Sequence, residues 1–287
     1  GFSLVTGERL LKTQPITGVD APWQWTRNHG CNSAIASVNL VLFRSAAAGF
    51  FDLERYGGTG NFGGYRSSCT SNLIAANGVL NSPDYTRTCT CSYQNQTSLA
   101  LVHHPDTEMW TFNNLDLGDA PVARLGLNLG APGDRMAEDG TLWIEYPYVG
   151  GPTPKVPVSV EPDGIQWIRR HSVRMAGDGL KWVGASFGKG ITALRVTLGG
   201  ADPKVHTYTV RLYFAEPDDL DAGERVFDVA VQGKAAVSAL DIVAEAGGPM
   251  RTIVKQFDGV EVQRDLAIDL SPGKGAPVLS GIEMIAD

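Results

Sequence analysis

The chain has 287 residues, of which 19 % are charged, below the roughly 25 % of typical globular domains, and its formal net charge is −7 at pH 7. This acidic balance argues against nucleic acid as a partner, because phosphate binding needs clustered Lys and Arg. No apolar run approaches the roughly 20 residues of a membrane-spanning helix, so no membrane span is expected. The 34 Gly and 16 Pro suit many short strands joined by tight turns, which predicts an all-β protein.

The first 118 residues read as a series of short strands. Residues 2–5 and 8–12 form a predicted hairpin around a Thr6-Gly7 turn. Further apolar strands are expected at 40–43, 49–53 and 71–81, with Gly-rich turns between them. The polar, turn-rich stretch 113–121 is the best domain boundary, so we place two domains at 1–118 and 119–287.

The second domain contains the clearest strand pattern in the chain. In residues 208–214 apolar and polar side chains alternate with a period of two, and residues 227–231 repeat the pattern. The acidic stretch 217–223 contains Pro and Gly and cannot continue either strand. We therefore expect an antiparallel pair with a charged tip. Residues 130–164 show little periodicity and are expected to form a long loop.

Four blocks in the second domain carry a family resemblance: Leu-Tyr-Phe-Ala-Glu at 212–216, Arg-Val-Phe-Asp-Val at 225–229, Leu-Asp-Ile at 240–242 and Ser-Gly-Ile-Glu-Met at 280–284. In this order and spacing they resemble the malectin-like carbohydrate-binding domains. The resemblance implies a jelly-roll β-sandwich over about 122–287 and carbohydrate as a partner. The family's ligand residues are not matched at 217–219 or 274–277, so glycan specificity does not carry over.

The first part resembles the blades of secreted bacterial propeller proteins with quinoprotein-like (PQQ-like) repeats. The resemblance rests on the 2–12 hairpin and on the order of apolar strand, Asp-Leu, Gly-rich turn, Ser-Cys-Thr and Ala-Asn-Gly in 40–81. Residues 1–118 would make only about two to three blades of 40 to 45 residues. A closed propeller ring needs about four to eight blades. The remaining blades are therefore expected on another chain or another segment of a precursor. Because the chain starts without Met, we expect it to be a processed or truncated piece of a longer protein.

All four cysteines lie in the first part, at Cys31, Cys69, Cys89 and Cys91. An even number in an extracytoplasmic β-protein predicts two disulfides, and the sequence does not choose among the three connectivities. Because a bond between Cys89 and Cys91 would strain the backbone, we expect each to pair with Cys31 or Cys69.

A metal site is the alternative for the same cysteines. It would combine Cys31, Cys89 and Cys91 with His29, and with His103 or His104. The Cys-x-Cys spacing differs from the two-residue gap of zinc knuckles, which favours the disulfides. No metal is therefore assigned here.

Ionisable residues near His103 invite a catalytic interpretation. His103, His104 and Asp106 could supply a general base with its carboxylate, joined by Arg27 and His29. The competing reading is a turn between strands at 99–102 and 108–112, and it is favoured. The Asp and Ca2+ ligands of quinone-dependent dehydrogenases have no match either. No catalytic residue is assigned. A non-catalytic role is favoured, and whether the chain is an enzyme stays open.

Aromatic residues of the second domain are the candidate ligand-binding residues. Sugar recognition stacks an aromatic face on a pyranose while polar groups bind its hydroxyls. The candidates are Trp143, Tyr146, Tyr148 and Trp182, with Trp167 beside them. Each of these has the alternative role of core residue or loop anchor. Trp182 and Tyr148 have small or charged neighbours, which suggests exposure.

Two acidic stretches could supply oxygens to Ca2+: Asp218, Asp219 and Asp221 in one, and Asp134, Glu138 and Asp139 in the other. Solvated turns are the favoured alternative. No other cofactor is expected.

Three functions remain open from the sequence. The leading hypothesis is a non-catalytic, extracytoplasmic module that binds carbohydrate or another surface ligand, at the end of a larger propeller protein. The second is a fragment or subunit of a polysaccharide-active or quinoprotein-like enzyme. The third is a structural protein of a cell-surface assembly.

Overall fold

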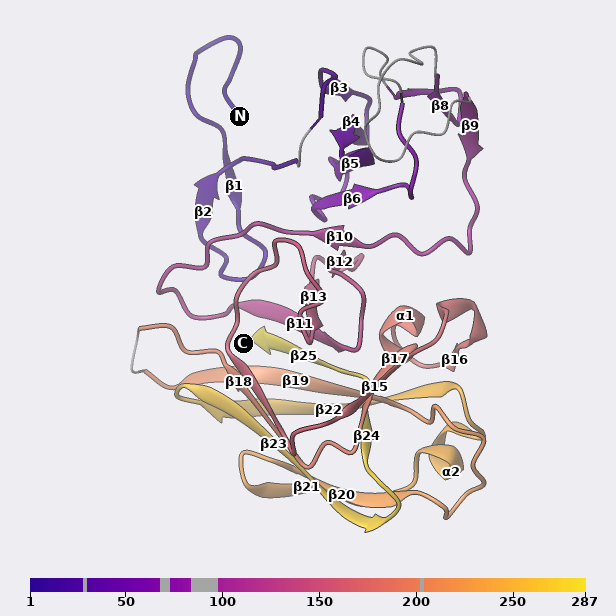
Figure 1. Ribbon diagram of the computed structural model, residues 1–287. Coiled ribbons are helices and arrows are strands. Elements are labelled where there is room, and N and C mark those ends of the chain that lie inside the picture. The colour runs from indigo at the N-terminus through magenta and orange to yellow at the C-terminus, as the bar shows by residue number, and fades with distance from the viewer. Residues whose placement is uncertain (28–29, 68–72, 84–97, 202–203) are drawn as a thin grey trace. The chain divides into compact units, whose positions relative to one another are not determined.

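The computed structural model describes residues 1–27, 30–67, 73–83, 98–201 and 204–287 (Figure 1). Nearly all of its regular elements are strands, which confirms the predicted all-β class. The chain forms two compact units: residues 1–12, 22–114 and 133–140 in the first, and 13–21, 115–132 and 141–287 in the second. The assignment of 1–118 to propeller blades and 119–287 to a sandwich stays a prediction.

The first unit contains a five-stranded antiparallel sheet in the order β10-β6-β5-β4-β3. Four of its strands follow one another in sequence as a meander. Apolar side chains of β4 and β5 point to both faces, so Leu42 and Phe50 are buried on one face while Phe43 and Phe51 are buried on the other. The strands are β3 (Ile35–Ala36), β4 (Leu40–Ser45), β5 (Ala47–Asp52), β6 (Thr59–Asn61) and β10 (Thr111–Phe112).

A second sheet of this unit, β7-β8-β9, confirms another part of the predicted strand series. Asn77 and Gly78 both have positive φ, 51° and 75°, in the turn between β7 and β8. This is the backbone that a two-residue hairpin turn requires. The strands are β7 (Ile74–Ala76), β8 (Val79–Ser82) and β9 (Leu99–Val102).

Short elements complete the N-terminal part. The Gly7 N–H donates to the Ser3 carbonyl at 2.9 Å, which confirms the predicted turn in the first hairpin. Strands β1 (Leu11–Thr13) and β2 (Asp20–Pro22) form a two-stranded sheet. Strand β12 (Arg135–Met136) follows Asp134, whose backbone pairs with that of Thr111.

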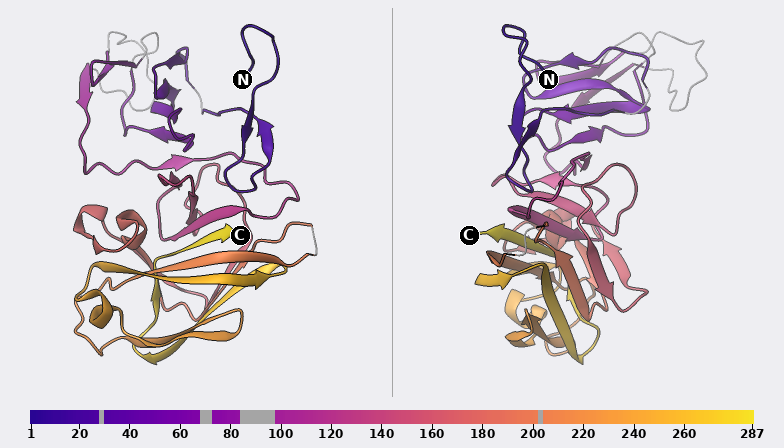
Figure 2. Two further views of the ribbon diagram at one scale, coloured as in Figure 1. Left: turned by 180° about the vertical axis from the view of Figure 1, so that it is seen from behind. Right: turned by 90° about the vertical axis from the view of Figure 1, so that its left-hand side faces the viewer.

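The second unit is a β-sandwich. Its first sheet runs β13-β11-β25-β19-β22-β16, with parallel pairing at β11·β13 and β16·β22 and antiparallel pairing elsewhere. The strands are β11 (Arg124–Leu129), β13 (Leu142–Tyr146), β16 (Ala176–Gly177), β19 (His206–Ala215), β22 (Arg251–Val262) and β25 (Gly281–Ala286). Figure 2 shows the same strands from behind and from one side.

The second sheet of the sandwich runs β14-β18-β23-β20-β21. Three further strands form a small separate sheet in the order β15-β17-β24. The strands are β14 (Val158–Glu161), β15 (Gln166–Arg169), β17 (Ser186–Lys189), β18 (Ala193–Thr197), β20 (Val226–Val231), β21 (Lys234–Leu240), β23 (Asp265–Lys274) and β24 (Val278–Leu279). The helical elements are short: a 3-10 turn (Ser172–Arg174), α1 (Lys181–Gly184) and α2 (Ile242–Ala246).

The predicted alternation in β19 and β20 is confirmed, but their predicted pairing is wrong. Tyr208 and Phe214 of β19 are fully buried, and Phe227 of β20 is 1 % exposed. However, β19 pairs with β22 and β25, whereas β20 pairs with β21 and β23 in the opposite sheet. The rings of Phe214 and Phe227 meet at 6.0 Å. Placing the two strands in facing sheets buries both apolar faces against each other, which one hairpin would not do.

The expectation of a long loop over 130–164 is also wrong. Strand β13 occupies 142–146 and β14 occupies 158–161. Trp143 and Ile144 are both fully buried although they point to opposite faces of the sheet. A strand that is buried on both faces loses the period-two pattern on which the prediction relied.

Candidate functional site

Three aromatic side chains form an edge-to-face series, here called the aromatic row: Tyr148, Tyr146 and Trp167. The ring centroids of Tyr146 lie 6.2 Å from Tyr148 and 5.7 Å from Trp167, at interplanar angles of 75° and 80°. Tyr146 ends β13, and Trp167 is in β15. The row thus joins Trp167 to two tyrosines that lie 19 and 21 residues before it in the sequence.

The backbone positions the row at the surface. Trp167 pairs with Gly188 of β17, and a Cβ at Gly188 would lie 2.8 Å from Cζ3 of the indole. The glycine therefore allows the ring to lie close against the strand. The Tyr148 hydroxyl donates to the Val156 carbonyl at 2.9 Å, and the residue is 43 % exposed. Tyr146 and Trp167 are half-buried. Burial raises the pKa of Tyr146.

The chemistry of the row suits an uncharged ligand with an apolar face. Partly exposed rings offer flat surface and little charge, and the hydroxyls of Tyr146 and Tyr148 add hydrogen-bonding capacity. Two of the four predicted ligand-binding residues, Tyr146 and Tyr148, therefore lie together, and Trp167 joins them.

Trp143 and Trp182, the other two predicted ligand-binding residues, lie in a separate cluster. The Trp143 ring contacts Trp182 at 5.8 Å and Tyr213 at 5.1 Å, both edge to face. Trp143 is fully buried, so it offers no face to a ligand in solution, and its prediction as a binding residue is corrected to a core role. Trp182 is partly buried, because α1 holds its ring against Trp143. Its lysine and glycine neighbours did not indicate this packing.

A cluster of ion pairs lies where β19 ends. Arg225 is 5 % exposed and binds the fully buried Glu216 through Nη1 and Asp218 through Nη2, the latter at 2.9 Å. Lys189 Nζ contacts the same Asp218 oxygen at 2.7 Å. The Asp218 N–H donates to Glu216 Oε1 at 3.0 Å. The acidic stretch is thus fixed to the strand end by two cations.

Burial and hydrogen bonding act in opposite directions on the two carboxyls. Burial raises the pKa of Glu216, and the Asp218 N–H and the Arg225 guanidinium only partly offset it. Burial also acts to raise the pKa of Asp218, but hydrogen bonds from Lys189 and Arg225 outweigh it and lower that pKa. Asp218 is therefore a stable anion in this cluster.

The ion-pair cluster and the aromatic row are carried by neighbouring residues of one ladder. Gln166 pairs with Lys189, and Trp167 pairs with Gly188. Successive side chains of a strand point to opposite faces, so Lys189 and Trp167 are directed to opposite sides of this ladder. The two groups are separate features, and the aromatic row is the one whose rings are partly exposed to solvent.

Three of the acidic residues named as possible Ca2+ ligands have protein partners in the structure. Asp218 is occupied by two cations, as described, and Asp134 is fully buried with Asn113 Nδ2 donating to its Oδ2 at 3.0 Å. Glu138 lies 3.3 Å from Arg55 in an exposed pair. Within the described ranges, no three His, Cys, Asp or Glu residues gather as a metal ion would require.

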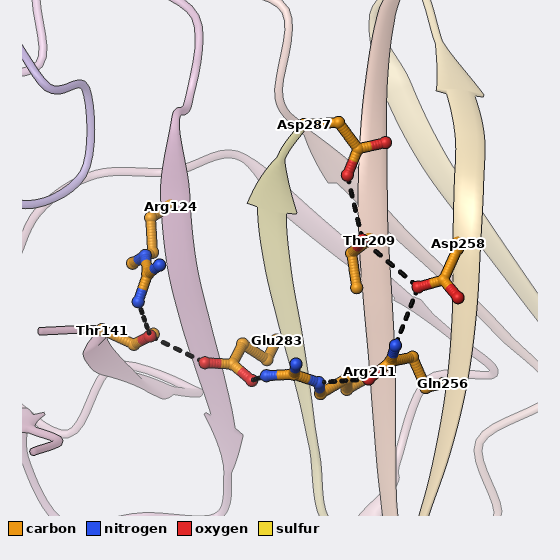
Figure 3. Close-up of polar contacts among 8 residues, drawn as sticks. All are labelled: Arg124, Thr141, Thr209, Arg211, Gln256, Asp258, Glu283 and Asp287. Atoms are coloured by element: carbon orange, nitrogen blue, oxygen red, sulfur yellow. Dashed lines mark hydrogen bonds and ion pairs between the residues drawn. The ribbon is translucent and has the colours of Figure 1, made fainter. Parts of the chain in front are cut away.

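A polar network crosses the outer face of the first sheet of the sandwich (Figure 3). At its centre Glu283 of β25, with a side chain only 3 % exposed, accepts from Thr141 Oγ1 at 2.7 Å and from Arg211 Nη1 at 2.9 Å. Arg211 Nε donates to Gln256 Oε1 at 2.7 Å. The network continues through Arg124, Asp258, Thr209 and Asp287. Each of these eight residues thus has a polar partner within the network.

Sequence reasoning missed Arg225, Lys189, Arg211 and Glu283. Arg211 occupies a polar position in the β19 alternation, and Glu283 lies in a closing strand of otherwise apolar residues. A charged residue inside an apolar strand pattern is the signal that indicates a buried ion pair.

The ionisable residues of the first unit form no shared site within the described chain. His103, His104 and Asp106 are exposed in the predicted turn, where the Asp106 N–H donates to His104 Nδ1 at 3.3 Å. Arg27 donates to the Asn32 carbonyl at 2.9 Å. Cys31 is exposed, with Arg44 Nη1 at 3.7 Å from its Sγ. His29, Cys69, Cys89 and Cys91 lie outside the described residues, so the disulfides stay a prediction.

No helix in the described parts of the chain has the length and apolar character needed to cross a membrane.

Comparison with known proteins identifies part of the second unit. The malectin domain family matches residues 202–280. A probable receptor-like protein kinase of Arabidopsis thaliana is 34 % identical over 94 residues, which are 28 % of this chain and 12 % of that protein.

Solved structures of a plant receptor and of a bacterial enzyme are similar to parts of this chain. The ANX2 ectodomain of Arabidopsis thaliana has a TM-score of 0.43 at 15 % identity, over 56 % of this chain and 49 % of that chain. A β-glucuronidase of Bacteroides uniformis has a TM-score of 0.45 at 14 % identity, over 91 % of this chain and 29 % of that one. The chain thus spans about an eighth of the curated relative and half of the receptor ectodomain. Residues 202–280 carry a malectin domain.

Proposed function

We propose that the second unit is a non-catalytic, extracytoplasmic carbohydrate-binding module, with the aromatic row as its sugar-binding surface. The malectin match at 202–280 supports the ligand class. The partly exposed, edge-to-face rings of Tyr148, Tyr146 and Trp167 are the observation that carries the position of the site.

The row would bind a neutral saccharide by stacking. The apolar face of a pyranose ring packs on an exposed aromatic face, while the tyrosine hydroxyls bind sugar hydroxyls. The Tyr148 hydroxyl already holds the Val156 carbonyl, which fixes the ring before the ligand arrives. A preorganised ring loses little freedom on binding, which favours affinity.

The test is a glycan array followed by titration calorimetry with the strongest neutral ligand. Trp167→Ala and Tyr148→Ala should each weaken binding about tenfold, because an aromatic contact contributes about 0.5–1.5 kcal/mol beyond its burial. Phe2→Ala is the matched control, since that ring is 66 % exposed but lies outside the row. Thermal unfolding of each variant checks the fold. Unchanged affinity in folded Trp167→Ala and Tyr148→Ala would remove the row as the site, and no binding to any glycan would remove the function.

For the first unit we propose the role of propeller blades within a larger secreted bacterial protein. One observation favours it: β3, β4, β5 and β6 form a consecutive antiparallel meander, which is the arrangement of a propeller blade. Intact mass and native mass of the protein from its source test the proposal. A larger polypeptide or a co-purifying chain with further blades is expected, and an isolated monomer of 30.7 kDa would contradict it.

A further inference from the structure

A groove of about 630 Å³ lies in the second unit, at the end of β19 opposite the ion-pair cluster. Four backbone segments line it: 117–122, 155–157, 197–201 and 263–264. They lead into β11 and β14, follow β18 and connect β22 to β23. No ring of the aromatic row is among the described lining residues, although the Tyr148 hydroxyl contacts the carbonyl of the lining residue Val156.

Backbone hydrogen bonds between these segments fix the shape of the groove. The Val122 N–H donates to the Leu198 carbonyl at 2.8 Å, and the Leu198 N–H donates to the Arg264 carbonyl at 2.8 Å. The Thr197 N–H donates to the Pro157 carbonyl at 3.0 Å. Each segment is thus tied to a neighbour, so the groove is formed without a ligand and binding requires little reorganisation.

The groove combines an apolar floor with a cationic mouth. Val122, Val156 and Leu198 are at most 5 % exposed, whereas Lys155 is exposed and the Arg264 side chain is 78 % exposed. Arg264 Nε approaches Asp265 only to 4.0 Å, and Asp265 Oδ1 is held by the Thr197 hydroxyl at 2.6 Å. The described lining residues include two cations and no acid, in a chain of net charge −7.

This chemistry selects against a neutral sugar as the occupant. No aromatic ring is among the described lining residues, so the groove has no stacking platform. Recognition must come mainly from charge, with the Gln263 side chain as a further polar group of the lining. The Thr197 hydroxyl is held by Asp265, and the Gly199 N–H is held by the Arg264 carbonyl. A compact body with one carboxylate would place its anion between Lys155 and Arg264 and its C–H surface on the floor.

We propose that this groove is a second subsite, which binds a carboxylate-bearing saccharide residue of the hexuronate type. The inference rests on the proposed carbohydrate-binding function for the saccharide part of the ligand, and on the groove alone for its charge. A glycan that contains both neutral and acidic residues would engage the row with the former and the groove with the latter.

Titration calorimetry with three probes tests the groove: a short oligogalacturonate, a neutral oligogalactoside of equal length, and free galacturonate. The acidic oligosaccharide should bind more tightly than the neutral one. Lys155→Gln and Arg264→Gln should each weaken acidic binding about fivefold, as expected for one exposed ion pair, and salt should weaken it further. Lys234→Gln, which removes an exposed cation of β21, is the matched control and should change nothing.

Amide spectra of the protein with free galacturonate provide a readout that does not depend on the aromatic row. Shifts at Leu198, Gly199 and Gly200 that vanish in the Lys155→Gln, Arg264→Gln double variant support the groove, and tighter binding of the oligosaccharide identifies a glycan rather than a free acid as the source. Equal affinity for the acidic and the neutral oligosaccharide would refute the groove as an acid-binding subsite. The same holds if only Trp167→Ala weakens binding of the acidic oligosaccharide. Both results leave the proposed carbohydrate-binding function intact. Absence of any shift with every acidic probe overturns the groove outright.

Discussion

Removal of Arg225 should destabilise the sandwich strongly, because the Glu216 carboxylate beside it has no access to solvent. Arg225 is 5 % exposed and Glu216 is fully buried, and the pair joins the end of β19 to the start of β20. Arg225→Met keeps much of the aliphatic volume but leaves the buried carboxylate without its cation. Breaking a buried pair in this way costs about 3–5 kcal/mol.

The magnitude is measurable by thermal or urea unfolding. For a unit of this size 1 kcal/mol shifts the melting temperature by about 2–4 °C, so Arg225→Met should melt roughly 10 °C lower. Replacing both partners, as in Glu216→Met with Arg225→Met, should recover most of the loss, because an apolar pair replaces a buried ion pair at little net cost. The double-mutant cycle then isolates the coupling between the two side chains.

The pH dependence gives an independent check. Burial raises the pKa of Glu216, and loss of Arg225 should raise it further. A carboxyl whose folded-state pKa lies above the ordinary value of 4.5 takes up its proton more readily in the folded state. Stability of the variant relative to the natural protein should therefore increase as pH falls towards 4.5.

A surface pair provides the control for this experiment. Lys255 and Glu245 form an ion pair with side chains 27 % and 40 % exposed, and Lys255→Met should cost no more than about 1 kcal/mol. If Arg225→Met costs no more than this control, or if its loss of stability does not shrink at low pH, then Glu216 is not held as a buried anion and the reasoning fails.

Two further predictions concern the core of the sandwich. Burial raises the pKa of Tyr208 to about 12, and its hydroxyl donates to the Val122 carbonyl at 2.8 Å. The free energy of unfolding should fall as pH rises from 10 to about 12, and Tyr208→Phe should make that fall smaller, at a cost of about 1 kcal/mol at pH 7. Burial also raises the pKa of Tyr65 to about 12, so part of the slope should remain, and an unchanged slope in Tyr208→Phe would refute the prediction. Gly126→Ala would place a Cβ inside the Trp143 indole and should lower the free energy of unfolding by about 1–3 kcal/mol, measured with urea. The same substitution in the Trp143→Phe background should cost less. An unchanged free energy of unfolding would show that the indole ring can move aside.

The strands were predictable from sequence where one face alone is buried. The alternation of Tyr208, Val210, Leu212 and Phe214 identified β19 because its other face carries Thr209 and Arg211. The partner strands were not predictable, because an alternating pattern specifies which face is buried and leaves open which strand supplies the hydrogen bonds. The ten residues between β19 and β20 could close a hairpin or cross to the other sheet.

The candidate site was predictable in its residue types and not in its grouping. Aromatic residues near glycines indicated Tyr148 correctly as exposed. The same reasoning suggested exposure for Trp182, whose ring is instead partly buried against Trp143. The expected loop over 130–164 included Trp143, but Gly126 opposite it provides the space that buries the indole. Local neighbours in sequence say little about a cross-strand partner, and such partners decide burial in a sheet.

The Leu-Tyr-Phe-Ala-Glu block illustrates how a family motif separates architecture from binding. Leu212 and Phe214 fill the sandwich core, Tyr213 packs on Trp143, and Glu216 binds Arg225 of the next block. These four side chains of the motif therefore pack in the core or form an ion pair within the protein. A motif whose residues are consumed by packing can persist while the ligand changes, so the ligand has to be sought in surface groups such as the aromatic row and the cationic groove.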